Sequence, residues 1–512
     1  MKTIKYNLLM ITILSFVISS CSEDFLDRNN LNGAGEETFF KTENDANQAL
    51  IAVYGRLQSG TFSSNIPLYG SIADNMLTPA LNSGFAQFAE GTEAPGDGGA
   101  GIARWSECYA GIFRANFFLA NASNVEMDSN DLNRMNAEAT FLRAFYYYNL
   151  IYFFGDVPLL LEPISIDEAI AITRTDKETV VTIIMNDLDF ALANLPESTS
   201  EYGRVTKVAA AALRTRILLY EKDYPSVITN AQAIMNGTYG DFTLFPDFET
   251  LFREVNEGNS EVLWDIQFSS IEQIGQGAPW DNGYQSDSKS AAVLPNLVEA
   301  FNSTNGLSID DPLNTLYDSN FPYDNRDPRM KASIHIPGEQ WGDLGTWPEY
   351  RTGSPTSFPW APETKYAMKK YMTPETEAPN NIYPNGTNFI VFRYADILLM
   401  YAEAKIESGS IDQSTLDAIN DVRARAYGTT KEDTMNYPEV TTTSQSELTT
   451  ILRKERRVEF AIEGLRWLDL VRWDELEVVR TAINRSFQAN IWPIPSTEIQ
   501  IAPGLTQNAP WN

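Results

Sequence analysis

The sequence predicts a mainly α-helical protein, in which a scaffold of helical hairpins carries a large irregular region with minor β-structure. Apolar residues recur at helical spacing over most of the first 240 residues and again from residue 391 onward. Between these blocks Pro, Gly, Asn and Asp dominate, and helical spacing is weak. A chain of 512 residues with 43 % hydrophobic content is long enough to bury a large core without disulfide bonds.

The N-terminus has the features of a bacterial lipoprotein signal. A short cationic segment precedes the apolar run Leu8–Ile18, which is about half of the ~20 residues that a membrane-spanning helix needs. Two serines and then Cys21 follow this run. Cleavage before such a cysteine creates a new amino group, and this group and the thiol take acyl chains. Two or more acyl chains anchor a protein stably. We expect residues 1–20 to be removed and Cys21 to be lipidated; the alternative is an ordinary signal peptide cut near a cysteine.

The net charge and the histidine content exclude several functions. The formal net charge of −30 repels polyanions, which excludes nucleic acid as a partner. His335 is the only histidine, so a multi-histidine zinc site is excluded, and so is a histidine-assisted nucleophile elsewhere in the chain. His335 alternates with apolar residues in "ASIHIPG" and is predicted to lie in a strand. We predict no enzyme, no metal and no cofactor.

Helices are predicted along the first block from apolar spacing and polar N-terminal residues. Their ranges are 42–58, 102–123, 131–153, 178–194, 205–221 and 224–236. Cys108, Trp105 and Tyr109 fall in the second helix and are assigned to the core. The polar stretch 21–35 is expected to be a tether, and residues 81–101 are expected to be a Gly-rich loop.

Two predicted helix pairs share one pattern of small and large residues. The stretch "AAAALRTRILLYEKDYPSVITNAQAIM" places alanines where two helices must approach closely, with a turn at Asp223 and Tyr224. Residues 393–428 repeat this arrangement. Such helix–turn–helix units form the core of tetratricopeptide-type pairs. The alternative is a generic helical hairpin.

The region 240–390 is predicted to consist of long irregular loops on this scaffold. Stretches such as "APWDNGY" and "GEQWGDLGTWPEYRTGSPTSFPWAP" are rich in Pro and Gly with interspersed Trp and Tyr. The run "EVLWDIQF", residues 261–268, is a predicted strand. Ordered loops on a rigid scaffold are a common position for binding residues.

Several stretches resemble the SusD/RagB-type surface lipoproteins, in order along nearly the whole mature chain. They are "CSEDFLD" (21–27), "AEATFLRAFYYYNLIYFFGDVPLL" (137–160), "NRDPRM" (325–330), "FRYADILLMYAEA" (392–404), "ERRVEFAIEGLRWLDLVRW" (455–473) and "PIPSTEIQIAPGLTQNAPW" (493–511). The resemblance implies a SusD-like fold built on tetratricopeptide-like pairs. It also implies a lipid anchor in the outer membrane facing the cell exterior, with Ser22, Glu23 and Asp24 as the surface-export signal.

The resemblance further implies a non-catalytic function: capture of an oligosaccharide or polysaccharide and its transfer to a partner SusC-like TonB-dependent transporter. The expected organisation is one globular unit behind a cleaved signal. Its parts are the signal peptide (1–20), the lipidated Cys21 and tether (21–35), an N-terminal helical part (36–240) and a C-terminal part (241–512) that is loop-rich over 241–390 and helical over 391–485.

Aromatic residues of the loop-rich region are the first candidates for glycan contact. The C–H faces of a pyranose stack on flat rings, while amides and carboxylates bond its hydroxyls. The candidates are Trp280, Asp281, Asn282, Tyr284, Trp341, Trp347, Tyr350 and Trp360. A second set, Asp74, Asn75, Phe85 and Phe88, lies in the early segment that lines the ligand face in the family. The alternative is that these aromatic rings anchor large loops.

Charged residues of the motif 455–473 are predicted to hold the scaffold together rather than to bind ligand. Arg456, Arg457, Glu459, Glu463, Arg466, Asp469 and Arg472 recur three to four residues apart, which allows ion pairs along and between helices. Asp396 and Glu403 are expected to pair with arginines of neighbouring helices.

Two other functions stay open from sequence. One is a binder of peptide or another nutrient on the same scaffold, and the other is a lipid-anchored glycoside hydrolase. The net negative charge favours a neutral glycan over a uronic-acid or sulfated polymer, although a groove can hold arginines of its own.

Overall fold

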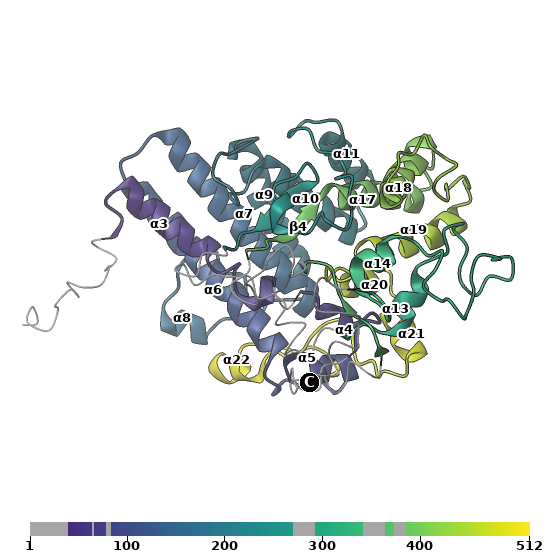
Figure 1. Ribbon diagram of the computed structural model, residues 1–512. Coiled ribbons are helices and arrows are strands. Elements are labelled where there is room, and N and C mark those ends of the chain that lie inside the picture. The colour runs from purple at the N-terminus through teal and green to yellow at the C-terminus, as the bar shows by residue number, and fades with distance from the viewer. Residues whose placement is uncertain are drawn as a thin grey trace, which may run out of the picture.

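The computed structural model describes residues 39–63, 66–77, 83–269, 292–340, 364–372 and 386–511 (Figure 1). The long helices of the first block follow the predicted ranges closely. They are α3 Glu43–Tyr54, α6 Ala100–Asn121, α7 Ser129–Phe154, α9 Lys177–Asn194, α10 Lys207–Tyr220 and α11 Tyr224–Met235. Polar caps fix several of these starts: Thr42 forms a capping box at α3, and Asp128 and Asp176 accept backbone N–H bonds at α7 and α9.

Successive helices of this block pack against one another. Helix α6 contacts α3 and α7, α9 lies between α7 and α10, and α10 pairs with α11. The stack continues into the second block, because α11 packs against α17 (Tyr394–Glu407), which pairs with α18 (Gln413–Ala426) and also contacts α19 (Gln445–Glu459). Figure 1 shows this row from α3 at one end to α18 and α19 at the other. The predicted mainly α-helical, tetratricopeptide-like scaffold is confirmed.

The hairpin of α10 and α11 forms as its sequence predicts. The alanines at 209–212 are completely buried, so neighbouring helices approach closely. The turn lies at residues 221–223, one position earlier than predicted, and Lys222 takes a positive φ of 60° there. Asp223 then caps α11 by accepting a hydrogen bond from the Ser226 N–H at 3.3 Å.

Two small antiparallel sheets supply the β-structure of the described residues. Strand β1, Val262–Ile266, forms within the predicted strand and pairs with β4, Phe389–Arg393. Strand β2, Ile334–His335, pairs with β3, Ala367–Met368. The strand predicted around His335 is therefore confirmed, although it is only two residues long.

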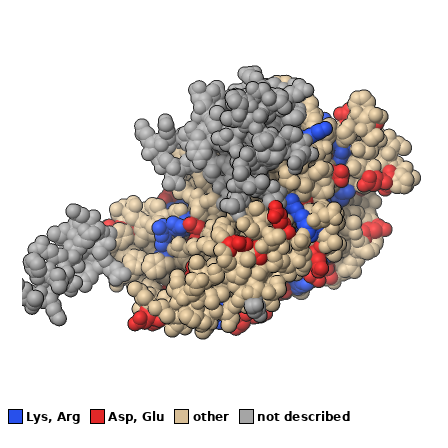
Figure 2. All heavy atoms as spheres, turned by 90° about the horizontal axis from the view of Figure 1, so that it is seen from below, with Lys and Arg blue, Asp and Glu red and all other residues tan. Residues whose placement is uncertain are grey.

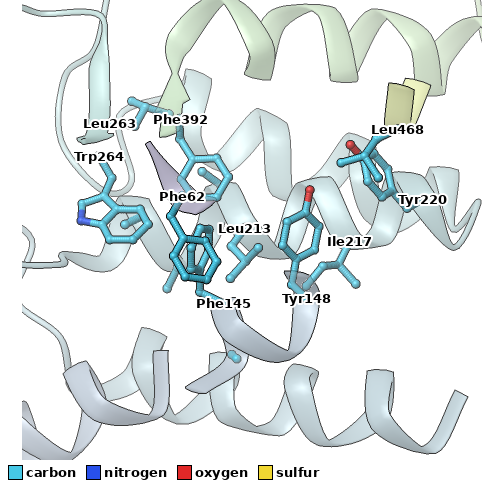
Figure 3. Close-up of a cluster of buried hydrophobic side chains, with 14 of the residues drawn as sticks. Phe62, Phe145, Tyr148, Leu213, Ile217, Tyr220, Leu263, Trp264, Phe392 and Leu468 are labelled. Carbon is cyan, nitrogen blue, oxygen red and sulfur yellow. The ribbon is translucent and has the colours of Figure 1, made fainter. Parts of the chain in front are cut away.

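One large core joins the helical stack to the first sheet. In Figure 3 the ring of Trp264 on β1 lies beside Phe145 of α7, with Phe62 and Phe392 close by. Trp264 meets Phe145 edge to face, with ring centroids 5.3 Å apart. Cys108 is completely buried, and burial raises the pKa of its thiol to about 12, as expected of a core cysteine. Trp105 is buried too, whereas Tyr109 is half-buried and donates its hydroxyl to the Pro158 carbonyl at 2.8 Å.

The Gly-rich loop predicted for 81–101 is partly wrong. Residues Ser83–Glu90 form helix α5, and α6 already begins at Ala100. Phe85 packs edge to face on Tyr69 at 5.2 Å, and Phe88 packs on Trp492 at 4.2 Å. These tertiary contacts stabilise a helix that local composition disfavours.

Short elements connect these parts of the structure. They are η2 Gly60–Phe62, α4 Tyr69–Ile72, η3 Ala122–Asn124, α8 Ile166–Ile170, η4 Glu254–Asn256, α13 Pro295–Ala300, α14 Arg329–Ser333, α20 Arg466–Arg472, α21 Leu476–Ala482 and α22 Ser496–Ile501. Over the part of the chain that the structure describes, every helix is too short or too polar to cross a bilayer.

Candidate functional site

The aromatic candidates of the irregular region lie outside the described residues. These are Trp280, Asp281, Asn282, Tyr284, Trp341, Trp347, Tyr350 and Trp360, and the same holds for Cys21, Ser22, Glu23 and Asp24. The structure does describe the residues that flank the segments 78–82, 270–291 and 341–363. The site is therefore built here from these flanking residues.

Flanking residues from three distant parts of the sequence meet at one place. Met76 forms an antiparallel bridge with Val293, and the Leu77 N–H donates to the Ala292 carbonyl at 2.9 Å. Ala292 also bridges Ala367, which pairs with His335 in the second sheet. We call Met76–Leu77, Ala292–Leu294 and Ala367–Met368 the anchor region. It brings together one end of each segment that carries predicted ligand residues.

Asp74 and Asn75 attach the anchor region to the helical scaffold. The Asn75 carbonyl accepts from the Leu294 N–H at 3.0 Å, and the Asp74 carbonyl accepts from the Asn296 side chain at 2.6 Å. Both residues are only 3 % exposed. Their backbone carbonyls thus hold the chain at Leu294 and Asn296.

Two arginines of the motif 455–473 bind the side chains of this pair. Arg466 donates to both oxygens of Asp74 at 2.9 and 3.0 Å, and Arg457 bonds Asp74 and the Asn75 Oδ1, each at 3.0 Å. Burial by itself raises the pKa of Asp74, but the guanidiniums of Arg457 and Arg466 outweigh burial and leave this pKa below its ordinary value. Asp74 is thus a buried, ionised attachment point between α4, α19 and α20.

Phe85 and Phe88 lie in the core. They are 2 % and 6 % exposed and pack on Tyr69 and Trp492. The structure therefore gives the four described candidates (Asp74, Asn75, Phe85 and Phe88) packing and attachment roles beside the anchor region. Their contact with ligand stays a prediction, as it does for the residues outside the described ranges.

A second attachment point holds the residues that precede the segment 270–291 and those that follow the segment 373–385. Asn388, before β4, accepts from the Phe268 N–H at 2.8 Å, so the chain at 269 lies beside the chain at 387. Asn388 also donates to Asp265 at 3.2 Å and, through its backbone N–H, to Glu257 at 2.7 Å. Burial raises the pKa of Asp265 to about 6 and that of Glu257 to about 8. Both carboxyls are engaged with protein groups, an arrangement suited to holding backbone in place.

A buried network of ion pairs joins β1 and β4 to α14, α18 and α19. Arg393 at the end of β4 bonds Glu261, Glu459 and Glu463, at 2.7 to 2.8 Å to the nearest oxygens. Glu459 also accepts from Arg425 at 2.5 Å and from Arg329 at 2.9 Å. Arg329, Arg425 and Glu261 were missed by the sequence analysis, since nothing in their local pattern shows that β1, β4, α14, α18 and α19 meet here.

The same motif pairs with neighbouring helices as predicted. Asp396 bonds Arg216 of α10 at 2.7 Å and Arg456 at 3.0 Å. Burial opposes ionisation of Asp396, yet these two arginines lower its pKa to about 2. Glu403 pairs with Arg472, whose guanidinium also bonds Asp469 at 2.8 Å. The scaffold function predicted for these charges is confirmed.

His335 contributes to the anchor region from a buried position. Its Nδ1 lies 3.1 Å from Glu339 Oε2, and Lys369 donates to the other oxygen of Glu339 at 2.7 Å. Among the described residues, His, Cys, Asp and Glu side chains form no group of three that could hold a metal ion. His335 and Lys369 both contact Glu339 beside the second sheet.

Known proteins of one family match this chain over most of its length. The family model described as "SusD family" matches residues 254–511, and one described as "Starch-binding associating with outer membrane" matches residues 24–219. SusD-like protein P2 of Formosa agariphila is 28 % identical over 479 residues, covering 91 % of this chain and 90 % of the relative.

Solved structures with the same fold include two at 25 % identity. A SusD-like carbohydrate-binding protein from Bacteroides fragilis superposes with a TM-score of 0.78. A laminarin-binding SusD-like protein superposes with a TM-score of 0.73. Each alignment covers 92 % of this chain and all of the other.

Proposed function

Because the chain belongs to the SusD family, we propose that it is a non-catalytic, surface-anchored lipoprotein that binds an oligosaccharide and passes it to a SusC-like TonB-dependent transporter. The observation that carries the proposal is the anchor region. It gathers one end of each of the segments 78–82, 270–291 and 341–363, and Trp280, Trp341, Trp347 and Trp360 lie in the latter two. Loops fixed to a rigid frame position side chains for binding with little loss of conformational entropy.

The printed names of relatives support carbohydrate as the ligand class. One solved neighbour is called carbohydrate-binding and another laminarin-binding. Sugar recognition also needs little titratable machinery, in keeping with a chain that has a single histidine. The carboxyls of raised pKa near Asn388 are engaged with backbone and amide groups, so they do not favour the hydrolase alternative.

The tryptophans test glycan binding directly. We expect single changes of Trp280, Trp341, Trp347 and Trp360 to alanine to leave the thermal unfolding temperature unchanged, while at least one of them abolishes retention on a polysaccharide in affinity electrophoresis. The physical reason is the loss of a stacking face for the pyranose ring. Trp264→Ala is the contrasting control, because this buried tryptophan belongs to the core and its loss should lower stability.

Full retention by all four loop variants would contradict the assigned ligand residues. Absence of binding by the wild-type protein to any member of a broad glycan panel would contradict the proposed function itself. Binding to a peptide library in that case would favour the peptide alternative.

Surface display depends on the residues that follow the lipidated cysteine. We expect the double change Glu23→Ala and Asp24→Ala to leave the protein membrane-bound but protected from protease added to intact cells, because the anchor needs only Cys21. Cys21→Ala, which removes the anchor, is the control for membrane attachment. Unchanged protease sensitivity of the double variant would show that these acids do not direct export.

A further inference from the structure

A cavity lies between α19, the end of α18 and the chain that follows α13. Its volume is about 540 Å³, within the range of roughly 300 to 1,000 Å³ that is usual for ligand pockets. It is lined by the end of α13 and the chain after it, by Asp327 and Arg329 at the start of α14, by the end of α18, by residues 438–442 and by the middle of α19. None of the tryptophans proposed above lies in these lining segments.

Among the described residues, Lys454 is the cation of α19 for which no ion pair forms. Arg453 pairs with Glu475, Arg456 with Asp396 and Arg457 with Asp74. Lys454 lines the cavity, is half-buried, and forms no hydrogen bond or ion pair within the described ranges of the chain. An ammonium group withdrawn from water without a counterion is unfavourable, so a bound anion there would stabilise the protein.

The charged groups around Lys454 include paired arginines, a carboxylate and one further cation without an ion pair in the described residues. Burial, followed by the guanidiniums of Arg457, Arg326 and Arg423, lowers the pKa of Lys454, and Asp310 acts in the opposite sense. Arg457 and Arg423 are matched by their own carboxylates. Arg326 instead donates to the carbonyls of Val298 and Phe301, both at 2.6 Å, and forms no ion pair in the described part of the chain.

The molecule is therefore not uniformly negative despite its net charge. Figure 2 shows Lys and Arg side chains between acidic ones on the described part of one face. A local cation inside a cavity decides which group binds there more than the distant sum of charges does, because charges on an exposed surface are screened within about 10 Å.

The rest of the lining suits a sugar ring. Tyr427, which is half-buried, lines the cavity, and the hydroxyl groups of Tyr427 and Thr441 form no hydrogen bond within the described ranges. Arg329 and Arg423 also line the cavity, but they are paired with the lining carboxylates Asp327 and Glu455. An aromatic residue, hydroxyl groups and one cation without an ion pair in the described residues together match the apolar face, hydroxyls and charge of an acidic pyranose.

We propose that this cavity binds a negatively charged sugar unit, with its carboxylate or sulfate at Lys454 and its ring against Tyr427. The inference rests on the proposed glycan-binding function and adds to it a ligand class and a second subsite. It reverses the preference for neutral glycans drawn from net charge. Glu439 also lines the cavity and is exposed, so its carboxylate opposes the anion and supplies a test of opposite sign.

The test measures affinity for three probes: polygalacturonate oligosaccharides (carboxylate), sulfated galactan oligosaccharides (sulfate) and laminarin oligosaccharides (neutral). We expect wild-type binding to at least one acidic probe. Lys454→Met should weaken it by about tenfold or more at low ionic strength, while leaving any laminarin affinity unchanged. Lys454→Arg should retain most of the affinity, and Glu439→Gln should strengthen acidic binding.

Stability supplies the matched control. Since Lys454 has no partner in the described structure, Lys454→Met should not lower the unfolding temperature. A loss of affinity in this variant could then not be attributed to misfolding. Lys222→Met, at the exposed turn between α10 and α11, should leave all affinities unchanged. Comparing the affinities for the polygalacturonate and the sulfated galactan probes shows whether the cavity prefers a carboxylate or a sulfate on the sugar.

Equal affinity of Lys454→Met and wild type for an acidic probe would overturn the inference. Binding to laminarin with no binding to either acidic probe would overturn it too, while leaving the proposed glycan-binding function supported. Binding to no glycan at all would overturn both.

Discussion

Glu459→Gln is expected to destabilise the protein by about 3–5 kcal/mol at pH 7, which lowers the unfolding temperature of a chain of this length by about 3–5 °C. Glu459 is completely buried and accepts from Arg329, Arg393 and Arg425. Glutamine has nearly the same shape but removes the negative charge, so three buried guanidiniums are left with too few counterions. Thermal and urea unfolding followed by circular dichroism measure the effect.

The pH dependence distinguishes this cause from a packing defect. Burial by itself raises the pKa of Glu459, but Arg425, Arg393 and Arg329 outweigh burial and hold it well below its ordinary value of 4.5. A carboxylate with a lowered pKa contributes stability above pH 4.5 and loses it as pH falls. The difference in the free energy of unfolding between wild type and Glu459→Gln should therefore be largest at pH 6–8 and should decrease as the pH falls below 4.5.

The control is Glu477→Gln, which removes an exposed carboxylate of α21. We expect it to change stability by less than about 0.5 kcal/mol. Equal stability of the two variants, or a gap that does not change with pH, would contradict the role given to Glu459.

Trp492→Ala is expected to cost about 3–5 kcal/mol, because it leaves a cavity in a cluster of aromatic rings. Trp492 is 2 % exposed, and its ring centroid lies 4.2 Å from Phe88 and 4.8 Å from Phe153. Its backbone N–H also donates to the Phe153 carbonyl at 2.6 Å. The change should loosen α5 and the C-terminal segment together, and hydrogen exchange of residues 83–95 and 490–511 would detect this.

Two further variants serve as comparisons for the stability loss of Trp492→Ala. Trp492→Phe keeps an aromatic ring in the cluster and should lose less stability than Trp492→Ala. Trp511→Ala removes a half-buried ring near the chain end and should cost about 1 kcal/mol or less. A Trp492→Ala protein as stable as Trp511→Ala would contradict the central position of Trp492.

Local pattern predicted the scaffold well for a physical reason. Helices such as 177–194 and 224–235 are defined by apolar spacing and by Asp or Thr caps, both of which lie within a few residues of one another. Helix α5 was missed because its stability comes from Tyr69 and Trp492, the second of which lies some 400 residues away.

In the candidate site, too, some features were predicted from sequence and others were visible only in the fold. Asp74 and Asn75 were identified by residue type and family position, but their partners Arg457 and Arg466 are nearly 400 residues distant. Sequence therefore indicated that these residues matter, while only the fold shows that they attach the anchor region to α19 and α20. Lys454 carried no signal in sequence, since its lack of a partner is visible only when the partners of its neighbours are known.

The sequence by itself determined the family resemblance, the helical hairpins, the buried cysteine and the ion-pairing character of the motif 455–473. These features depend on residue order and on contacts within a helix or between adjacent helices. The tertiary structure decided which charges meet, where the flanks of the loop segments converge, and which cation is left beside a cavity. Those outcomes depend on distances between residues remote in the chain, because electrostatic and packing energies act through space and not along the sequence.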